Sequence, residues 1–573
     1  MEMETQIQRL KSRLAKINTV DLLGYIGSRL IPIGNDGESI ANSADIFSKT
    51  NLPSPLRQYV YLAGLLLSTE YDPTRQLRLD EALFCDLERK INEITEHYHE
   101  MHMEPFAIGN PSPAASRKSL ISFAAFNSYF ETGKLNYAEQ TVNKIRTIFS
   151  QFDEAKEKPL PLTAGDFIGI YEAICDLDER SINDVQHNID CLRSKLEEYS
   201  SELELNGAEE VIDDGQLLKN IGEKLGVDEQ FALCIKNAHV VKRGDLVHRF
   251  GEEKTDIFLS LFSTKRQTSD FMYYGQKSPF LDKPLVEIED GCFFVTFQPL
   301  IIEAVYEYIN NLVSQNTKLG KKKSDAVETM TFNYFKSIFG HSAQYFRQVC
   351  EKPRTDEHDI LILYEKYIFI IEVKGSKVRM PLFDPDKNSV RVENHFFGEA
   401  GIGYAYKQAI KLKGAIESHP SVTLYHDYEK PFTVTAVGKK VIPIVITLES
   451  FGQIEINTSI LITPEKSQPY PWACCVDDLE NLIKINKYLH KGPDEFVRYL
   501  KFREKYHEKI YATDELEILE CFYNNVFKMH EHDVYILKPT GKSLIDKIHF
   551  EELGVPYEYE FGITLETLNS GSN

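Results

Sequence analysis

The sequence contains no run of about 18 apolar residues, which is roughly the length a helix needs to cross a membrane. Its first residues, MEMETQIQRLKSRLAKI, are charged and lack the apolar stretch of a secretory signal peptide. The nine cysteines are scattered, only Cys474 and Cys475 are neighbours, and no C-x-x-C pair occurs. Free thiols in a reducing compartment explain this pattern better than disulfides or a zinc site. We therefore expect a cytoplasmic protein without a membrane segment.

The sequence also lacks the signatures of a nucleotide-driven enzyme. Pro539–Ser543 (PTGKS) resembles the end of a P-loop, but that motif needs glycine where the chain has Ile536. No other Walker A or helicase pattern, no zinc-finger module and no internal repeat occurs. The chain is therefore not expected to hydrolyse a nucleoside triphosphate.

A chain of 573 residues is too long for one hydrophobic core, and about three or four domains are expected. The formal net charge is −22, which by itself argues against a nucleic-acid partner. The charge is unevenly distributed, however, because residues 318–413 carry 17 basic and 12 acidic side chains. This segment is thus +5 while the remainder is −27. Local positive charge is what meets phosphate groups, so the segment is a candidate for nucleic-acid contact.

Composition and periodicity divide the chain into four regions and predict a multidomain α+β fold. Residues 1–275 form a mostly helical N-terminal region, in which a Pro-, Ser- and Gly-rich break near residues 105–119 separates two subdomains. Residues 276–315 predict a β-hairpin, turning at Asp290-Gly291, and a connecting helix. Residues 316–480 form a third region with both strand and helix patterns, for which a resemblance given below implies a mixed sheet flanked by helices, and residues 481–573 predict a small C-terminal helical and α+β region.

The most informative stretch consists of two runs of strand-forming residues, 358–364 and 367–373, separated by only two residues. A tight hairpin with those two residues at its tip places Asp359 opposite Glu372. Directly opposed residues of an antiparallel pair have Cβ atoms about 4.5–5.5 Å apart, so the two carboxylates would lie side by side. The period of two along a strand then places Lys374 on the same face as Glu372.

Two carboxylates held this close repel each other, and a divalent cation removes the penalty. Mg²⁺, for which Mn²⁺ can substitute, is bound through one or two carboxylates together with water and phosphate oxygens. Asp359, Glu372 and the backbone carbonyl of Val373 are therefore the predicted metal ligands. Lys374 is predicted to hold a water molecule or to stabilise charge developing on a phosphate. One alternative stays open, in which Asp359 and Lys374 form only a diagonal salt bridge across the hairpin.

The arrangement Asp359…Glu372-Val373-Lys374 resembles the motif of the PD-(D/E)xK nuclease superfamily, which includes restriction enzymes, Mrr-like enzymes and bacterial defence nucleases. His358 stands where that motif has proline. The resemblance covers roughly residues 318–450. It implies a restriction-endonuclease-like core, in which a helix precedes the ligand-bearing hairpin and a second helix and a further strand follow it.

The same resemblance assigns expected roles to residues outside the hairpin. The first helix of such a core often carries another acid, for which Glu328 is the match, after an expected basic loop at Thr317–Lys323. The second helix supplies a glutamine or lysine, for which Lys407 and Gln408 are the matches. Nucleic-acid contact is expected from four residues: Lys377, Arg379, Lys407 and Gln408.

The function implied by the resemblance is that of a Mg²⁺-dependent endodeoxyribonuclease, with DNA favoured over RNA and bacterial antiviral defence as the setting. The helical N-terminal half is expected to contact a regulatory protein partner, and a homodimer would suit the cutting of two strands. Three alternatives remain: a sequence-specific restriction-type enzyme, a nuclease-fold scaffold without catalysis, and a helical regulatory protein acting through protein partners. The combined presence of two acids and a lysine favours catalysis over the last two.

Overall fold

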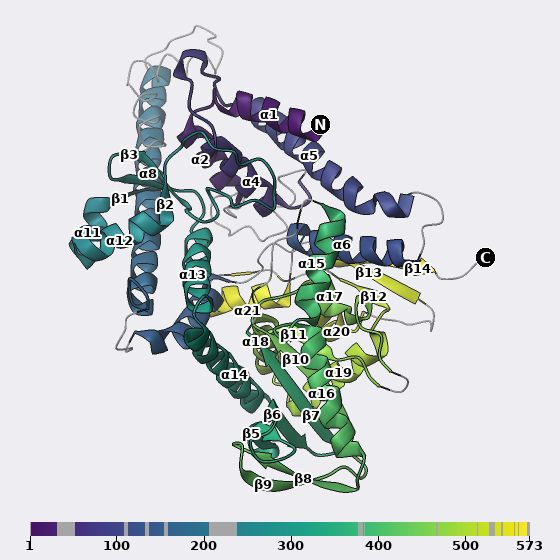
Figure 1. Cartoon of the computed structure of the whole chain (residues 1–573). Coiled ribbons are helices and arrows are strands. Elements are labelled where there is room, and N and C mark those ends of the chain that lie inside the picture. Colours follow the sequence, from purple (N-terminus) through teal and green to yellow (C-terminus); the bar gives the residue numbers. More distant parts are fainter. Residues whose placement is uncertain are drawn as a thin grey trace.

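The computed structural model of the chain describes residues 2–30, 52–107, 113–131, 137–153, 159–205, 238–375, 377, 382, 384–465, 468–512, 514–526, 533–539, 543–554, 556–557, 559 and 561–569. Within these residues a helical N-terminal region precedes a central mixed sheet of seven strands with helices, and a small C-terminal α/β part follows (Figure 1). The predicted mixed α+β architecture is thus confirmed. None of the helices described here is long and apolar enough to span a membrane.

Amphipathic helices build the first part of the N-terminal region: α1 (Glu2–Leu14), α2 (Thr19–Leu30), α4 (Pro55–Leu67), α5 (Glu81–Ala107) and α6 (Pro113–Glu131). The most apolar of them, α4, lies at the centre and is buried along almost its whole length. The predicted break at 105–119 is too wide, because α5 continues to Ala107 and α6 already begins at Pro113. Proline is compatible with the first turn of a helix, where its missing N–H has no intrahelical acceptor.

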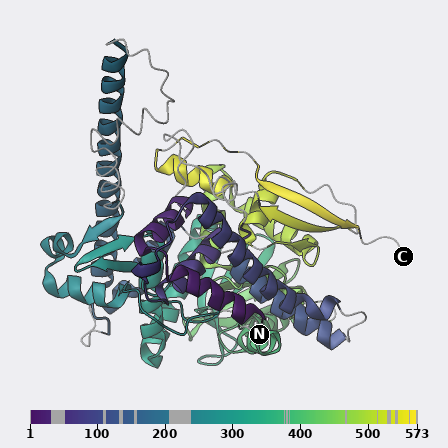
Figure 2. The same ribbon diagram turned by 90° about the horizontal axis from the view of Figure 1, so that it is seen from above.

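The chain continues through α7 (Ala138–Lys144) and short turns at Ile145–Phe149 and Ser150–Phe152 into the long helix α8 (Ala164–Leu205). The first turns of α8 bury Phe167, Ile170 and Ile174 in the main core. Its C-terminal part extends away from the rest of the molecule, as Figure 2 shows. Residues 182–205 are therefore the outer part of one longer helix.

A small sheet joins the N-terminal region to the connector. Its strands are β1 (Val240–Lys242), β2 (Ser263–Thr264), β3 (Leu285–Glu289) and β4 (Cys292–Val295), in the order β1-β4-β3-β2. The predicted hairpin is present and turns at Gly291, whose φ of +69° suits glycine. It does not stand alone, since an isolated two-stranded hairpin is only marginally stable and these strands pair with β1 and β2. Helices α11 (Arg243–Phe250), α12 (Glu252–Phe262) and α13 (Pro299–Ser314) complete this part.

The central sheet has the strand order β11-β10-β7-β6-β5-β8-β9. Its strands are β5 (Gln344–Cys350), β6 (Glu357–Tyr364), β7 (Tyr367–Lys374), β8 (Ser421–His426), β9 (Lys430–Thr435), β10 (Lys440–Thr447) and β11 (Trp472–Cys475). The pairs β7–β10 and β10–β11 are parallel, and the other neighbours are antiparallel. β7 is buried over nearly its whole length because helices cover both faces of the sheet.

Two helices flank the β6–β7 hairpin. α14 (Thr317–Phe339) packs against one face through Val327, Phe335 and Phe339, and α16 (Ile402–Glu417) packs against the other. The expected basic loop before α14 is wrong: the side chain of Asn316 caps the helix, which therefore starts at Thr317 and includes the lysines. A run of exposed lysines is compatible with a helix once a capping residue satisfies its first N–H groups. α15 (Pro385–Phe397) lies between the hairpin and α16 in the sequence.

The short helix α17 (Gln453–Ile456) lies between β10 and β11 in the sequence, and the C-terminal part follows β11 and combines helices with a second small sheet. Its helices are α18 (Val476–Tyr488), α19 (Pro493–Tyr506), α20 (Glu515–Tyr523) and α21 (Leu544–Glu552). The strands are β12 (Ile510–Tyr511), β13 (Asp533–Pro539) and β14 (Ile563–Asn569), in the order β12-β13-β14. One continuous apolar core runs from residue 145 to residue 537 and includes side chains of α8, α14, β7 and α19.

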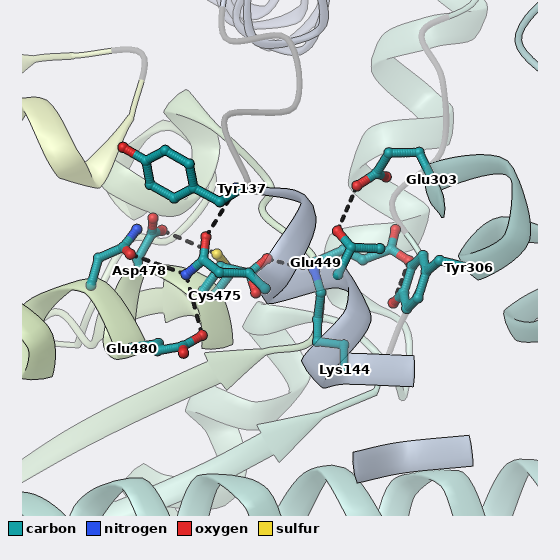
Figure 3. A network of polar contacts seen from close by, with 12 residues as sticks. Tyr137, Lys144, Glu303, Tyr306, Glu449, Cys475, Asp478 and Glu480 are labelled. Carbon is teal, nitrogen blue, oxygen red and sulfur yellow. Dashed lines mark hydrogen bonds and ion pairs between the residues drawn. The ribbon is translucent and has the colours of Figure 1, made fainter. Parts of the chain in front are cut away.

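A buried polar junction ties the N-terminal region to the end of the central sheet (Figure 3). Nζ of Lys144, the last residue of α7, donates to Oδ2 of Asp477 at 2.6 Å, and both side chains are almost fully buried. One turn earlier, Thr141 Oγ1 donates to Glu303 on α13 at 2.6 Å. Burial lowers the pKa of Lys144, but Asp477 and Glu303 more than offset this, so the pKa lies above its usual value. A buried ion pair therefore joins α7 of the N-terminal region to α18, which directly follows β11, in addition to the apolar packing.

Candidate functional site

The β6–β7 hairpin has the predicted register. Its pairs run from Tyr364 opposite Tyr367 at the tip to Ile360 opposite Ile371, and Glu365 at the tip has a φ of +47°. Beyond Ile360 the pairing between β6 and β7 ends, while β6 still pairs with β5 and β7 still pairs with β10. The predicted acids and lysine lie beyond this point.

The alternation of the two strands decides which face these residues share. Leu361 of β6 and Ile370 of β7 both lie in the core that faces α16. Alternation predicts the same face for Asp359 and Glu372, and because both Glu372 and Lys374 act on the pKa of Asp359, the three charged groups lie close together. Lys374 follows Glu372 on the same face, and its contact with α16 confirms the placement. The hairpin therefore brings the two acids and the lysine to one side of the sheet, as predicted.

The carboxylate of Asp359 takes the place of the next ladder bond. Its Oδ2 accepts a hydrogen bond of 2.6 Å from the backbone N–H of Val373. This contact holds the side chain of Asp359 against β7, directly beside Glu372. The neighbouring strand β5 is distorted next to it, since Gln348 has a φ of +50°. A left-handed non-glycine residue is uncommon, and such backbone strain clusters at functional sites.

Glu372 is fully buried, and only half of its carboxyl group has a hydrogen-bond partner. Oε1 lies 2.7 Å from Nδ1 of His358, which is itself 2% exposed. Oε2 has no hydrogen-bond partner among the described residues, and neither does Nε2 of His358. A buried polar atom without a partner costs free energy, so both atoms are positioned to gain from a ligand.

The electrostatics of the site show a shortage of positive charge. Burial raises the pKa of Asp359 to about 7, with repulsion by Glu372 as the second cause. Burial raises the pKa of Glu372 to about 8, although Lys374 acts in the opposite direction. The pKa of Glu328 on α14 is also raised to about 8, by burial and then by repulsion from Asp359 and Glu357. Asp359, Glu372 and Glu328 are therefore close enough to raise one another's pKa values, as expected for a cation site or an acid–base site.

Lys374 is held by the helix that covers this face. Its Nζ donates to Oε1 of Gln408 on α16 at 2.9 Å and lies 5.7 Å from the ring centroid of Tyr404. Gln408 was expected near the site from the resemblance, and the structure places it in direct contact with Lys374. The contact orients the ammonium group and leaves its other two protons available for a water molecule or a phosphate oxygen.

The remaining predicted nucleic-acid contacts lie further away. Nζ of Lys377 is ion-paired with Glu307 and donates to Asn311 Oδ1 at 3.0 Å, both on α13. Lys407 is exposed on α16, with its Nζ 5.5 Å from the ring centroid of Phe397. Arg379 lies outside the described residues. Lys407 is thus presented to a ligand, whereas Lys377 braces the loop after β7 against α13.

The chemistry of the donor set fits a hard divalent cation. Among the described residues no group of three or more His, Cys, Asp or Glu side chains is arranged to hold a metal ion. Mg²⁺ does not require such a group, since one or two carboxylates and several water molecules suffice. Asp359 and Glu372 are a pair of that kind, and Glu372 Oε2 is a buried acceptor without a partner. These two residues, with the Val373 carbonyl, are the ones that would hold the ion.

His358 is the residue whose role the sequence did not reveal. It occupies the position of the motif's proline, and its ring contacts the acid of the opposite strand. The only available signal was a histidine directly preceding the predicted ligand Asp359. Adjacent strand residues point to opposite faces, so the alternation rule predicted no contact between His358 and Glu372.

Comparison with protein-family models, with characterised proteins and with solved structures gave no match to this chain.

Proposed function

We propose that the chain is a metal-dependent nuclease that hydrolyses phosphodiester bonds at the open end of the β6–β7 hairpin. The observation that carries the proposal is the burial of Glu372 beside Asp359, with Oε2 lacking a partner and Lys374 following on the same face. Burying the Glu372 carboxyl group beside a second acid, with one of its oxygens unpartnered, costs free energy unless the site has a ligand. A Mg²⁺ ion with a phosphate group satisfies all three side chains.

Each residue has a distinct part in this proposal. Asp359, fixed by the Val373 N–H, and Glu372, fixed by His358, hold the ion. A bound Mg²⁺ supplies Lewis-acid polarisation of the phosphate and a water molecule with a lowered pKa. Lys374, oriented by Gln408, positions the attacking water or stabilises the charge that develops on the phosphate oxygens.

The proposal also gives roles to Glu328, to the substrate and to the N-terminal helices. Glu328 lies within the electrostatic reach of Asp359 and would act as an outer ligand or bind a second ion. The resemblance to PD-(D/E)xK nucleases favours DNA over RNA and suggests bacterial antiviral defence. In this proposal the N-terminal helices would bind a regulatory protein and transmit its binding through Lys144 of α7 and Asp477 of α18.

The direct experiment incubates the purified full-length chain with supercoiled plasmid, linear duplex, single-stranded DNA and RNA, each with Mg²⁺ or with EDTA. We expect Mg²⁺-dependent cleavage of at least one DNA substrate, abolished in Asp359→Asn and Lys374→Ala. Lys411→Ala is the matched control. Lys411 lies on α16, the helix that Lys374 contacts, but its ammonium group is ion-paired with Asp356 at 2.7 Å. Absence of cleavage of every substrate would leave the scaffold interpretation in its place, and equal cleavage by Lys374→Ala would refute the role proposed for Lys374.

A further inference from the structure

A small cavity lies at the other end of β10, away from the acids. It is lined by the first residues of β10 (Lys440–Pro443), by residues 468–472 leading into β11, and by Leu500, Arg503, Glu504 and His507 of α19 and its end. β10 runs parallel to β7, with Lys440 opposite Tyr367 and Thr447 opposite Lys374. At about 3.3 Å per residue, the cavity is roughly 20 Å from Lys374. It is therefore separate from the proposed active site.

The walls of this cavity are apolar and aromatic, and its volume is about 150 Å³. Val441, Pro471, Trp472 and Leu500 are buried side chains that contribute to them. An apolar cavity of about 150 Å³ is large enough to take up a benzene molecule. The size of this cavity thus suits one six-membered ring and not a larger ligand.

Two buried polar atoms without a partner belong to side chains that line the cavity. Arg503 is 4% exposed, and its Nε and Nη2 donate to Glu515 Oε1 at 3.0 Å and to the Ile456 carbonyl at 2.9 Å. Its Nη1 has no hydrogen-bond partner among the described residues. The same holds for the buried Oε1 of Gln468. The lining therefore offers one unused donor and one unused acceptor.

The charges around the cavity are already balanced. Arg503 is paired with Glu515, and Lys440 at the rim is ion-paired with Glu504. His507 stacks on Tyr470, with ring centroids 4.2 Å apart, and burial and then Arg503 lower the pKa of His507 to about 3. His507 is thus neutral at pH 7. With no surplus charge in the lining, an uncharged ligand fits better than a carboxylate or a phosphate.

We propose that this cavity binds a planar, uncharged, single-ring heterocycle that has an acceptor for Arg503 Nη1 and a donor for Gln468 Oε1. A pyrimidine base has this size and this polar edge. It can come from a free base or nucleoside, or from an unpaired nucleotide of a nucleic acid. The proposal stands independently of the proposed nuclease activity, because it uses none of the hairpin residues.

The test measures binding of uracil to the full-length protein by saturation-transfer NMR, with 1,3-dimethyluracil and benzene as comparison probes. We expect uracil to bind and dimethyluracil, whose ring N–H donors are blocked, to bind at least about 10-fold more weakly, since a neutral hydrogen bond is worth about this factor. Gln468→Leu should remove the difference between the two probes. Ile442→Phe, which fills the cavity from β10, should abolish binding of uracil and of benzene.

Gln453→Leu is the matched control, because Gln453 lies on α17 and does not line the cavity. Circular dichroism of both cavity variants shows whether each retains the fold. If Ile442→Phe does not fold, the comparison of uracil and dimethyluracil binding by Gln468→Leu is sufficient to test the proposal. Competition by oligothymidylate would identify nucleic acid as the source of the base, and its absence would identify a small molecule. The proposal is overturned if uracil fails to bind the parent protein. It is also overturned if Gln468→Leu keeps the same preference for uracil over 1,3-dimethyluracil as Gln453→Leu.

Discussion

Replacing Glu372 by glutamine separates the metal-binding role of this residue from its structural role. Burial raises the pKa of Glu372 to about 8, so without a cation the carboxyl group is largely protonated at pH 7. A glutamine is then a close match in size and charge, and its Oε1 can still accept from His358 Nδ1. We expect Glu372→Gln to fold in EDTA with the stability of the parent protein.

The difference appears when Mg²⁺ is added. A ligand that binds only the folded state stabilises it by RT ln(1 + [L]/Kd), which is about 1.4 kcal/mol for about 10 mM Mg²⁺ and a Kd of about 1 mM. For the unit built on the apolar core from residue 145 to residue 537, such a gain raises the melting temperature by about 2 °C, at about 2.1 cal/mol/K of unfolding entropy per residue. Glu372→Gln loses one of two carboxylates, so its melting temperature should rise by less than about 1 °C.

Thermal unfolding followed by circular dichroism, in EDTA and in Mg²⁺ at matched ionic strength, measures both quantities. Glu520→Gln is the matched control: Glu520 is also a buried glutamate, 3% exposed, but it lies on α20 in the C-terminal part, where it accepts from the backbone N–H of Leu544 at 2.9 Å. That variant should keep the full Mg²⁺ response. Equal Mg²⁺ shifts in Glu372→Gln and in the parent protein would show that the ion binds elsewhere, and the reasoning would fail.

Other substitutions test further parts of the structure. Lys374→Ala should lower the rate of Mg²⁺-dependent cleavage by at least about 100-fold while leaving the melting temperature in EDTA unchanged, and a milder loss of rate would refute its role. Lys144→Met should lower the free energy of unfolding by about 3–5 kcal/mol, because a buried ion pair is broken, and adding Asp477→Leu should recover most of it; urea denaturation measures both. Burial raises the pKa of Glu455 to about 7 from 4.5, so the folded state retains a proton that the unfolded state releases, and stability should fall by about 3 kcal/mol as pH rises from 4.5 to 7. In Glu455→Gln this part of the pH dependence of urea midpoints should disappear; an unchanged profile contradicts it.

The hairpin was predictable because everything that specifies it is local. Strand-forming residues, a two-residue tip and the alternation of faces are all contained in residues 358–374, and the observed register follows them. The contact between Lys374 and Gln408 joins residues 34 positions apart. It was reachable only through a resemblance that supplies a second helix, and not through periodicity.

Contacts between distant segments could not be predicted from the sequence. The sequence predicts that Lys377 contacts a nucleic acid, but in the structure its ammonium group binds Glu307, which lies 70 positions earlier in the chain. The Lys144–Asp477 pair joins residues 333 positions apart. A short polar residue after a strand is a common N-cap, so the sequence around Asp477 gives no sign of a distant partner. Such pairs depend on how whole helices pack, and single-sequence patterns do not carry that information.

The helix boundaries show the same limit in a milder form. The lysine-rich segment before Glu328 has the composition of a loop, and only the capping side chain of Asn316 reveals that α14 starts at Thr317. This matters for the site, because the extended helix carries Lys323 into the interior, where its Nζ donates to Asn310 Oδ1 at 3.0 Å. Part of the basic charge counted toward phosphate binding is therefore structural.

The most direct test of the metal site is a crystal of the protein soaked in Mn²⁺ and measured for anomalous scattering. The account predicts one strong peak between the carboxylates of Asp359 and Glu372, at ligand distances slightly above the 2.0–2.1 Å that Mg²⁺ takes, and none in crystals of Glu372→Gln. A peak bound elsewhere, or no peak while Glu372 keeps its bond to His358, would contradict it.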